Sequence, residues 1–199
     1  IQRDFKRLML PYFVFGILGI IVEFMKRIVL DREAFVWGEE LINLFYWMDA
    51  PSLVNTYAFV LWFLPTLFVA KCILYFVFKN IAREFIRFIA IMIFFSISFF
   101  VNTPFAFDEA LNAVLFVYIG YLVFNYYIPG KVIFSLALFT ILVVSIIYGI
   151  PSLDMARKIY QNIPLNILFS LTFVLLLIFI FKKFDFKNNL IKLWGGSTM

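Results

Sequence analysis

Residues 132–150 read VIFSLALFTILVVSIIYGI, an apolar run without a single charged side chain. An α-helix needs roughly 20 apolar residues to cross a hydrocarbon layer about 30 Å thick, and this run has that length. The run does not alternate between apolar and polar residues, as a strand of a membrane barrel would. Because backbone amides in lipid must be satisfied within their own segment, the run predicts a transmembrane helix.

Five further segments have the same apolar character. The predicted spans are residues 8–30, 57–78, 85–101, 110–127, 132–150 and 163–181. The predicted fold is therefore all-α: a polytopic bundle of six transmembrane helices without a sheet, in one membrane domain over residues 1–199. Pro65 lies inside the second predicted span and predicts a kink there. The sequence starts abruptly at IQRDFKRLML and ends soon after a new apolar stretch begins, so we expect it to be the middle of a longer protein.

The composition agrees with a membrane protein. Hydrophobic residues make up 65% of the chain and mean hydropathy is +1.01, whereas a soluble domain is typically about 45–50% apolar. The chain has no histidine and a single cysteine, Cys72. These counts exclude histidine-ligated metal sites, histidine-activated nucleophiles and internal disulfides within this sequence. We expect no bound metal or cofactor and no nucleic acid partner.

The longest segment between predicted spans is residues 31–56. Within it, Leu41, Phe45 and Met48 share one face of a helix, and Trp37 and Trp47 flank that face. Tryptophan is enriched at membrane–water boundaries. The segment therefore predicts a short interfacial helix lying parallel to the membrane, with the Leu41, Phe45 and Met48 face turned inward.

Charge asymmetry predicts the orientation, because lysine and arginine concentrate in cytoplasmic loops. Basic residues gather before the first predicted span, between the second and third, and after the sixth, whereas acids gather in the other loops. Both ends of the chain are therefore predicted to be cytoplasmic. Glu23 lies three and four residues before Lys26 and Arg27, which is the spacing for ion pairs along a helix.

Four apolar motifs resemble the acyltransferase-3 family, which includes enzymes similar to fucose 4-O-acetylase. They are KRLMLPYFVFGIL (6–18), LWFLPTLFVAKCILYFV (61–77), AVLFVYIGYLVFNYY (113–127) and NNLIKLWGGSTM (188–199). The motifs occur in the family's order over nearly the whole chain, and the second is the most specific of them.

The resemblance implies a bacterial inner-membrane O-acyltransferase. Such an enzyme moves an acyl group, typically acetyl, from cytoplasmic acyl-CoA to a hydroxyl of an extracytoplasmic glycan or lipid-linked sugar. The family's essential histidine lies upstream of any segment similar to this one. The resemblance therefore implies no catalytic residue in this chain, which would supply the walls of the site and the donor-binding groups.

Lys71 is the strongest candidate for a donor-binding residue. A charge near the middle of a span costs at least about 2.5–3.5 kcal/mol and should therefore face the bundle interior. It either meets the phosphate or thioester end of acyl-CoA or pairs with a polar group such as Tyr118, Tyr121 or Asn125. Trp62 and Phe63 either shape an acyl or acceptor pocket or pack as boundary aromatics. The donor-binding candidates Arg7, Arg83 and Arg87 belong to basic clusters that orientation alone also explains. Cys72 has no adjacent base and is not expected to accept an acyl group.

Acidic side chains of the loops opposite the predicted cytoplasmic face have two interpretations: they bind sugar hydroxyls, or they only hydrate the loops. They are Glu39, Glu40, Asp49, Asp108 and Glu109. The alternative function is that of a non-enzymatic polytopic protein, such as a transporter subunit. Transporters often show inverted repeats and paired broken helices, and the sequence shows no repeat.

Overall fold

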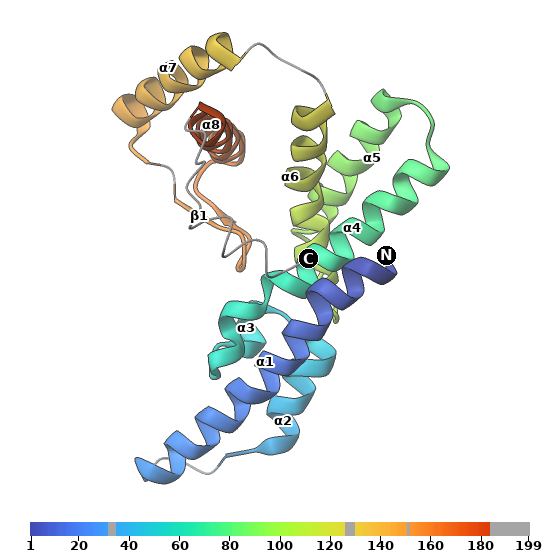
Figure 1. Ribbon diagram of the computed structural model, residues 1–199, viewed down its shortest axis with the longest axis vertical. Coiled ribbons are helices and arrows are strands. Elements are labelled where there is room, and N and C mark those ends of the chain that lie inside the picture. Colours follow the sequence, from blue (N-terminus) through green and yellow to red (C-terminus); the bar gives the residue numbers. More distant parts are fainter. Residues whose placement is uncertain (32–34, 126–129, 151, 184–199) are drawn as a thin grey trace. The chain divides into compact units, whose positions relative to one another are not determined.

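The structure, a computed structural model, describes residues 1–31, 35–125, 130–150 and 152–183 (Figure 1). Those residues form eight α-helices, a π-helix, a 3₁₀-helix and one pair of very short strands. The all-α prediction is confirmed. The prediction of no sheet is wrong in one detail: β1 (Leu153–Asp154) and β2 (Ile159–Tyr160) pair as a hairpin of two-residue strands.

The chain divides into two compact units, and the single membrane domain stays a prediction. The first comprises residues 1–125 and 154–159, and the second comprises residues 126–153 and 160–199. In the first unit, α1 (Gln2–Val29), α4 (Phe63–Asn80), α5 (Glu84–Ile97) and α6 (Phe107–Asn125) are the long helices. In the second unit, α7 (Gly130–Tyr148) packs against α8 (Ile163–Lys183).

Among the described residues, two helical segments are long and apolar enough to span a membrane, against six predicted: Gln2–Val29 and Tyr57–Asn80. Each of the other four predicted spans coincides with a helix. One of them, α5, has 14 residues, which is about 21 Å at roughly 1.5 Å per residue and shorter than a hydrocarbon layer. Apolar side chains along α1 are largely exposed, including Leu10, Phe15 and Val22.

The second of these segments begins as a 3₁₀-helix, η2 (Tyr57–Leu61), and continues as α4. Pro65 therefore lies in the first turn of α4 and not inside one long α-helix. A proline ring clashes with the carbonyl of the residue four positions earlier, which here is Leu61, where the 3₁₀-helix ends. The proline thus separates two helices instead of bending one.

The segment 31–56 folds as α2 (Trp37–Ile42), a π-helix η1 (Asn43–Trp47) and α3 (Ala50–Leu53). Its inward face differs from the prediction: Leu44 and Met48 are buried, whereas Leu41 and Phe45 are exposed. The reason is the π-helix, whose wider turn moves residues off the face that ordinary helical spacing assigns to them.

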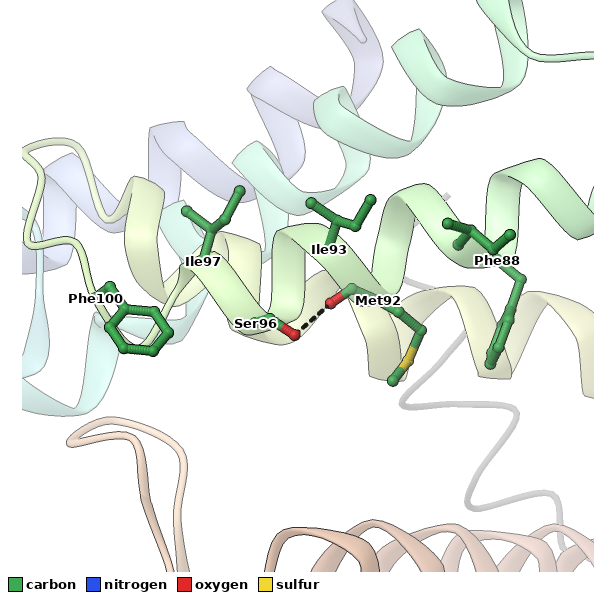
Figure 2. A pocket seen from close by; sticks show the side chains of 7 residues that line it. Phe88, Met92, Ile93, Ser96, Ile97 and Phe100 are labelled. Carbon is green, nitrogen blue, oxygen red and sulfur yellow. Dashed lines mark hydrogen bonds between the residues drawn. The ribbon is translucent and has the colours of Figure 1, made fainter.

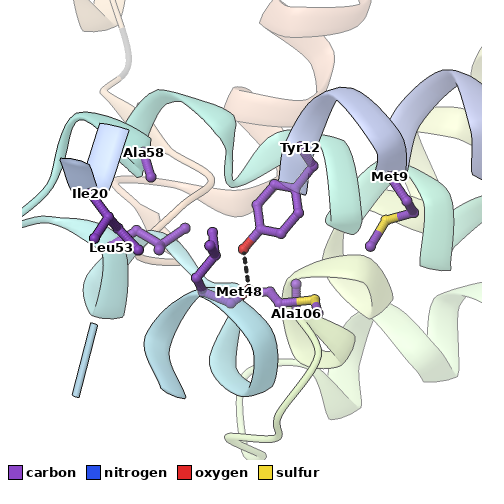
Figure 3. Close-up of a cluster of buried hydrophobic side chains, with 8 residues drawn as sticks. Met9, Tyr12, Ile20, Met48, Leu53, Ala58 and Ala106 are labelled. Atoms are coloured by element: carbon purple, nitrogen blue, oxygen red, sulfur yellow. Dashed lines mark hydrogen bonds between the residues drawn. The ribbon is translucent and has the colours of Figure 1, made fainter. Parts of the chain in front are cut away.

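The core of the first unit is built where α1 meets these short helices (Figure 3). The Tyr12 hydroxyl donates a 2.8 Å hydrogen bond to the Leu44 carbonyl, and Tyr12 is fully buried. Gly16 lies beside the buried Leu44 side chain, and Gly19 lies against the backbone of Ala58. Two glycines three residues apart thus let α1 approach η1 and η2 closely.

Helices α1 and α4 run antiparallel. The rings of Phe5 and Phe68 lie 5.6 Å apart, and the Lys26 ammonium lies 5.2 Å from the centre of the Tyr57 ring. Helix α6 packs against both α4 and α5. Residues 184–199, which include the fourth family-like motif, lie outside the described residues, and the common cytoplasmic location of both ends stays a prediction.

We predict that Gly16→Ala destabilises the protein while Gly120→Ala does not. A Cβ at Gly16 would lie 2.4 Å from Leu44 Cδ1, whereas a Cβ at Gly120 meets nothing within 4 Å. Overpacking a fixed core typically costs about 1–3 kcal/mol, and alanine for an open helical glycine gains roughly 0.5–1 kcal/mol. Thermal unfolding of both variants in lipid nanodiscs measures the difference. Equal midpoints for the two variants would show that Leu44 moves aside freely.

Candidate functional site

A polar pocket of about 350 Å³ lies within the first unit. Three segments far apart in the sequence form it: residues 47–52, residues 102–109 and the hairpin turn at residues 156–158. The side chains that give it chemical character are Trp47, Asp49, Asp108, Glu109, Arg157 and Lys158.

The backbone around this pocket is unusual. Met48, Phe105, Ala106 and Lys158 all have positive φ angles, of 60°, 62°, 51° and 55°. Each such residue other than glycine costs about 1–3 kcal/mol and persists only where surrounding contacts impose it. The π-helix η1 leads directly into Met48, and π-helical turns are frequent at functional sites. Strained backbone therefore borders the pocket on all three of its segments.

Two backbone hydrogen bonds join the first two segments. The Phe105 amide donates to the Tyr46 carbonyl at 2.7 Å, and the Ala106 amide donates to the Trp47 carbonyl at 2.9 Å. Ala106 is fully buried. These bonds fix the chain just before α6 begins, and so they place the acids of its first turn, Asp108 and Glu109, beside the end of η1.

Asp108 is 1% exposed and forms a buried ion pair with Lys158. Its Oδ1 also accepts hydrogen bonds from the Thr103 amide at 3.3 Å and the Thr103 hydroxyl at 3.4 Å. Lys158 donates a further bond to the Val101 carbonyl at 3.3 Å. The charge of Asp108 is therefore fully compensated, and its pairing attaches the hairpin turn to the first unit.

Glu109 differs from its neighbour. It is 3% exposed, it lines the pocket, and its Oε2 has no hydrogen-bond partner among the described residues. Burial, and then the negative charges of Asp108 and Asp49, raise the pKa of Glu109 to about 8, against the opposing effect of Lys158. A carboxyl group with a pKa near the working pH is suited to donate or accept a proton.

Asp49 and Arg157 complete the charged lining. Asp49 caps α3 by accepting a 2.9 Å hydrogen bond from the Ser52 amide. Arg157 lies 3.9 Å from Asp154 across the hairpin turn. The partly buried Trp47 adds an aromatic side chain to this polar lining. Within the described ranges, no three acidic or cysteine side chains are grouped so as to hold a metal ion.

The structure brings together three of the five acids that sequence analysis left open: Asp49, Asp108 and Glu109. Glu39 and Glu40 belong to α2 and do not line the pocket. Burial raises the pKa of Glu40, which lies near Arg27. The predicted pairing along α1 is confirmed: Glu23 binds Arg27 at 3.2 Å and Lys26 at 3.6 Å.

Lys71 does not face the bundle interior as predicted. Its side chain is 43% exposed, and its ammonium bonds Asp4 Oδ1 at 3.2 Å rather than Tyr118, Tyr121 or Asn125. Asp4 precedes the first predicted span, so this pair is level with the flank of that span and not with its middle. The prediction placed Lys71 in the membrane by counting residues along one helix. The depth of Lys71 also depends on the antiparallel register of α1 against α4, which that count does not contain. The donor role of Lys71 stays a prediction.

The other candidates do not gather around Lys71. Trp62 packs, half-buried, against the core cluster, and Phe63 is exposed. Arg7 is exposed one turn after Asp4. Arg83 and Arg87 follow the far end of α4, which is about 14 Å from Lys71 along the helix at roughly 1.5 Å per residue.

Arg87 has a structural task. Its guanidinium donates to the carbonyls of Ile81 at 2.6 Å and Phe78 at 3.5 Å, and lies 4.9 Å from the centre of the Phe78 ring. These contacts satisfy carbonyls at the C-terminal end of α4, where a cation is favourable.

A second, apolar groove of about 340 Å³ runs along α5 (Figure 2). Phe88, Met92, Ile97 and Phe100 line it, and its one hydroxyl, on Ser96, donates back to the Met92 carbonyl at 2.9 Å. The groove contains no charged side chain. It therefore offers apolar contact and no group for acid–base chemistry.

The sequence pattern does not identify Trp47, Arg157 and Lys158 as site residues. The sequence pattern places Trp47 at a membrane boundary and gives no role to Arg157 or Lys158. The available signal was local: an acidic pair directly before the apolar run of 110–127, and a basic pair within the loop before 163–181. Sequence spacing alone does not show that segments fifty residues apart meet.

No family model, curated protein or solved structure matches this chain. The resemblance to the acyltransferase-3 family therefore rests on the four motifs alone.

We predict that Lys158→Met strongly destabilises the protein. Removing one partner of a buried ion pair leaves an uncompensated charge and costs about 3–5 kcal/mol. Adding Asp108→Asn to Lys158→Met should restore most of the loss, because the charge left buried is then removed. Thermal unfolding of the single and double variants measures both effects. A single variant as stable as the wild type would contradict the pairing.

We also predict that stability falls as pH rises from about 4.5 to about 8. The pKa of Glu109 is raised in the folded protein, so the folded state holds the proton more tightly than the unfolded state over this window. Glu109→Gln should remove this part of the decline and raise the unfolding midpoint at pH 8. The exposed acid variant Glu39→Gln is the control. Identical pH profiles for wild type and Glu109→Gln would refute the prediction.

Proposed function

We propose that this chain is the membrane-embedded, acceptor-binding part of an O-acyltransferase in the bacterial inner membrane. In this proposal it transfers an acyl group, typically acetyl, from acyl-CoA to a hydroxyl of a glycan or lipid-linked sugar. The observation that carries the proposal is the pocket of Trp47, Asp49, Asp108, Glu109, Arg157 and Lys158.

The chemistry of that pocket suits a hydroxyl-bearing molecule. Carboxylates accept hydrogen bonds from hydroxyls, and Arg157 and Lys158 donate them. An aromatic side chain such as Trp47 gives the apolar face of a sugar ring a surface to pack on. Acyl transfer requires the hydroxyl to lose its proton as it attacks a thioester, and a positioned base lowers that barrier. In the proposed enzyme the histidine expected upstream is that base.

Exposed apolar helices support the membrane location. Soluble monomers rarely expose contiguous apolar patches larger than a few hundred Å², yet α1 and the groove on α5 expose mainly apolar side chains. We propose that these surfaces contact lipid. The segment of α2, η1 and α3 then lies at the extracytoplasmic boundary, with the pocket beside it.

The donor would approach from the cytoplasmic side, where the proposal places Lys71, Arg7 and Arg83. Their positive charges suit the phosphates of acyl-CoA. Because Lys71 is already paired with Asp4, a donor phosphate would have to displace or join that carboxylate.

We predict that native membrane vesicles containing this protein transfer label from radioactive acetyl-CoA to a glycan or lipid-linked sugar fraction. Trp47→Ala should lower the transfer by about tenfold or more, since removing an aromatic anchor from a binding pocket commonly costs at least about 1–2 kcal/mol. Trp37→Ala, on α2 outside the pocket, is the matched control and should keep wild-type transfer. Absence of transfer in the wild type would contradict acyl transfer. Saccharide uptake without transfer would favour the transporter alternative.

A further inference from the structure

We propose that the pocket binds an uncharged saccharide unit and that the neutral carboxyl of Glu109 donates a hydrogen bond to it, so that occupancy depends on the proton held there. This inference rests on the proposed function for the role of the pocket as an acceptor site. It adds that the ligand is uncharged and that ligand binding depends on the proton of Glu109.

The first step is the charge balance of the pocket. Asp108 is neutralised by Lys158, and Asp49 and Arg157 contribute one charge of each sign. With Glu109 protonated, these five side chains carry no net charge, and Asp154, 3.9 Å from Arg157, adds a negative charge beside them. The pocket therefore offers no surplus cation to hold a phosphate or a uronic acid, and an anionic ligand would face Asp49 and Asp108.

The second step is the geometry of Glu109. Its Oε2 is buried and has no partner within the described part of the chain, although it lies in the pocket lining. A buried polar atom without a hydrogen bond costs about 1–3 kcal/mol. A ligand oxygen at this position would recover that cost, because a protonated carboxyl is a hydrogen-bond donor.

The third step is which groups control the proton. Charged side chains from each segment that forms the pocket act on Glu109: Asp108 on α6, Asp49 before α3 and Lys158 on the hairpin turn. Arg157 lines the same pocket from the hairpin turn. Both aspartates and the burial of the side chain disfavour a negative charge on Glu109. The pKa of Glu109 is thereby raised to about 8, so the proton stays bound at neutral pH.

The fourth step is size. A volume of about 350 Å³ is near the lower limit of small-molecule sites, which span roughly 300–1,000 Å³. It suits one sugar ring with its hydroxyls. Trp47 and Pro51 supply apolar surface for the ring face, and the acids supply acceptors for its edge.

The test uses the purified protein in phosphatidylcholine nanodiscs, free of glycoside detergents that would themselves occupy the pocket. The probes are methyl α-glucoside, methyl α-galactoside and methyl α-mannoside as neutral sugars, glucuronic acid as the anion and glucosamine as the cation. Saturation-transfer NMR measures binding between pH 6 and 9.5. We expect at least one neutral glycoside to bind, with affinity falling about tenfold for each pH unit above the pKa of Glu109.

Three variants sharpen the experiment. Glu109→Gln keeps a hydrogen-bond donor and should bind the neutral glycoside with an affinity that no longer changes with pH. Glu39→Gln, altered outside the pocket, should keep the wild-type profile. Trp47→Phe should weaken binding without changing its pH dependence. The unfolding midpoint of each variant confirms that it is folded.

Several outcomes overturn the inference. They are no binding by any neutral glycoside, affinity independent of pH in the wild type, and a wild-type pH profile in Glu109→Gln. Tighter binding of glucosamine, strengthening as pH rises, would show that the ligand is a cation. Sugar binding that depends on the proton of Glu109, found without acyl transfer, would contradict only the proposed function. Acyl transfer found without such proton-dependent sugar binding would contradict only this inference.

Discussion

The packing of the π-helix η1 against α1 is the contact on which the rest of the first unit depends. Tyr12 donates to the Leu44 carbonyl, and Gly16 leaves room for the Leu44 side chain. With η1 held in this way, the carbonyls of Tyr46 and Trp47 accept the amides that precede α6. The start of α6, and with it Asp108 and Glu109, is therefore positioned by η1, about 60 residues earlier in the chain, which α1 in turn holds in place. Neither Tyr12 nor Gly16 lines the pocket, yet both hold the helix η1 that leads into it.

Two acids that are adjacent in sequence have different surroundings in the pocket: the charge of one is compensated by a cation, and the charge of the other would not be. Asp108 has a cation and two hydrogen-bond donors from Thr103, and so it can stay charged while buried. Glu109 has no donor at Oε2 and is pushed towards its neutral form. Adjacent residues on a helix point in different directions, which is how two neighbouring carboxyls reach such different surroundings. Environment, more than residue type, separates a structural charge from a group that exchanges a proton.

Sequence patterns predicted the helices well and their contacts poorly. Apolar runs located all six long helices, because burial or lipid contact of a whole helix leaves a strong local signal. The predictions of a kink at Pro65 and of the inward face of residues 41–48 were wrong, since a 3₁₀-helix and a π-helix change the spacing that such predictions assume. The pairing of Lys71 with Asp4 depends on the register between α1 and α4, which no single helix encodes. The acids of the pocket were recognised as candidates, but their cationic partners were not, because Lys158 reaches Asp108 only through the fold.

The attachment of the hairpin turn has a consequence for biosynthesis. Lys158 follows Asp108 by fifty residues, and α7 lies between them in the chain. At about 5–20 residues per second, a ribosome needs roughly 3–10 s to produce that interval. During this time the nascent chain carries Asp108 without its counterion. The pocket is thus among the last parts of the first unit to mature, and a chain whose synthesis stops within α7 would lack the cation that pairs with Asp108.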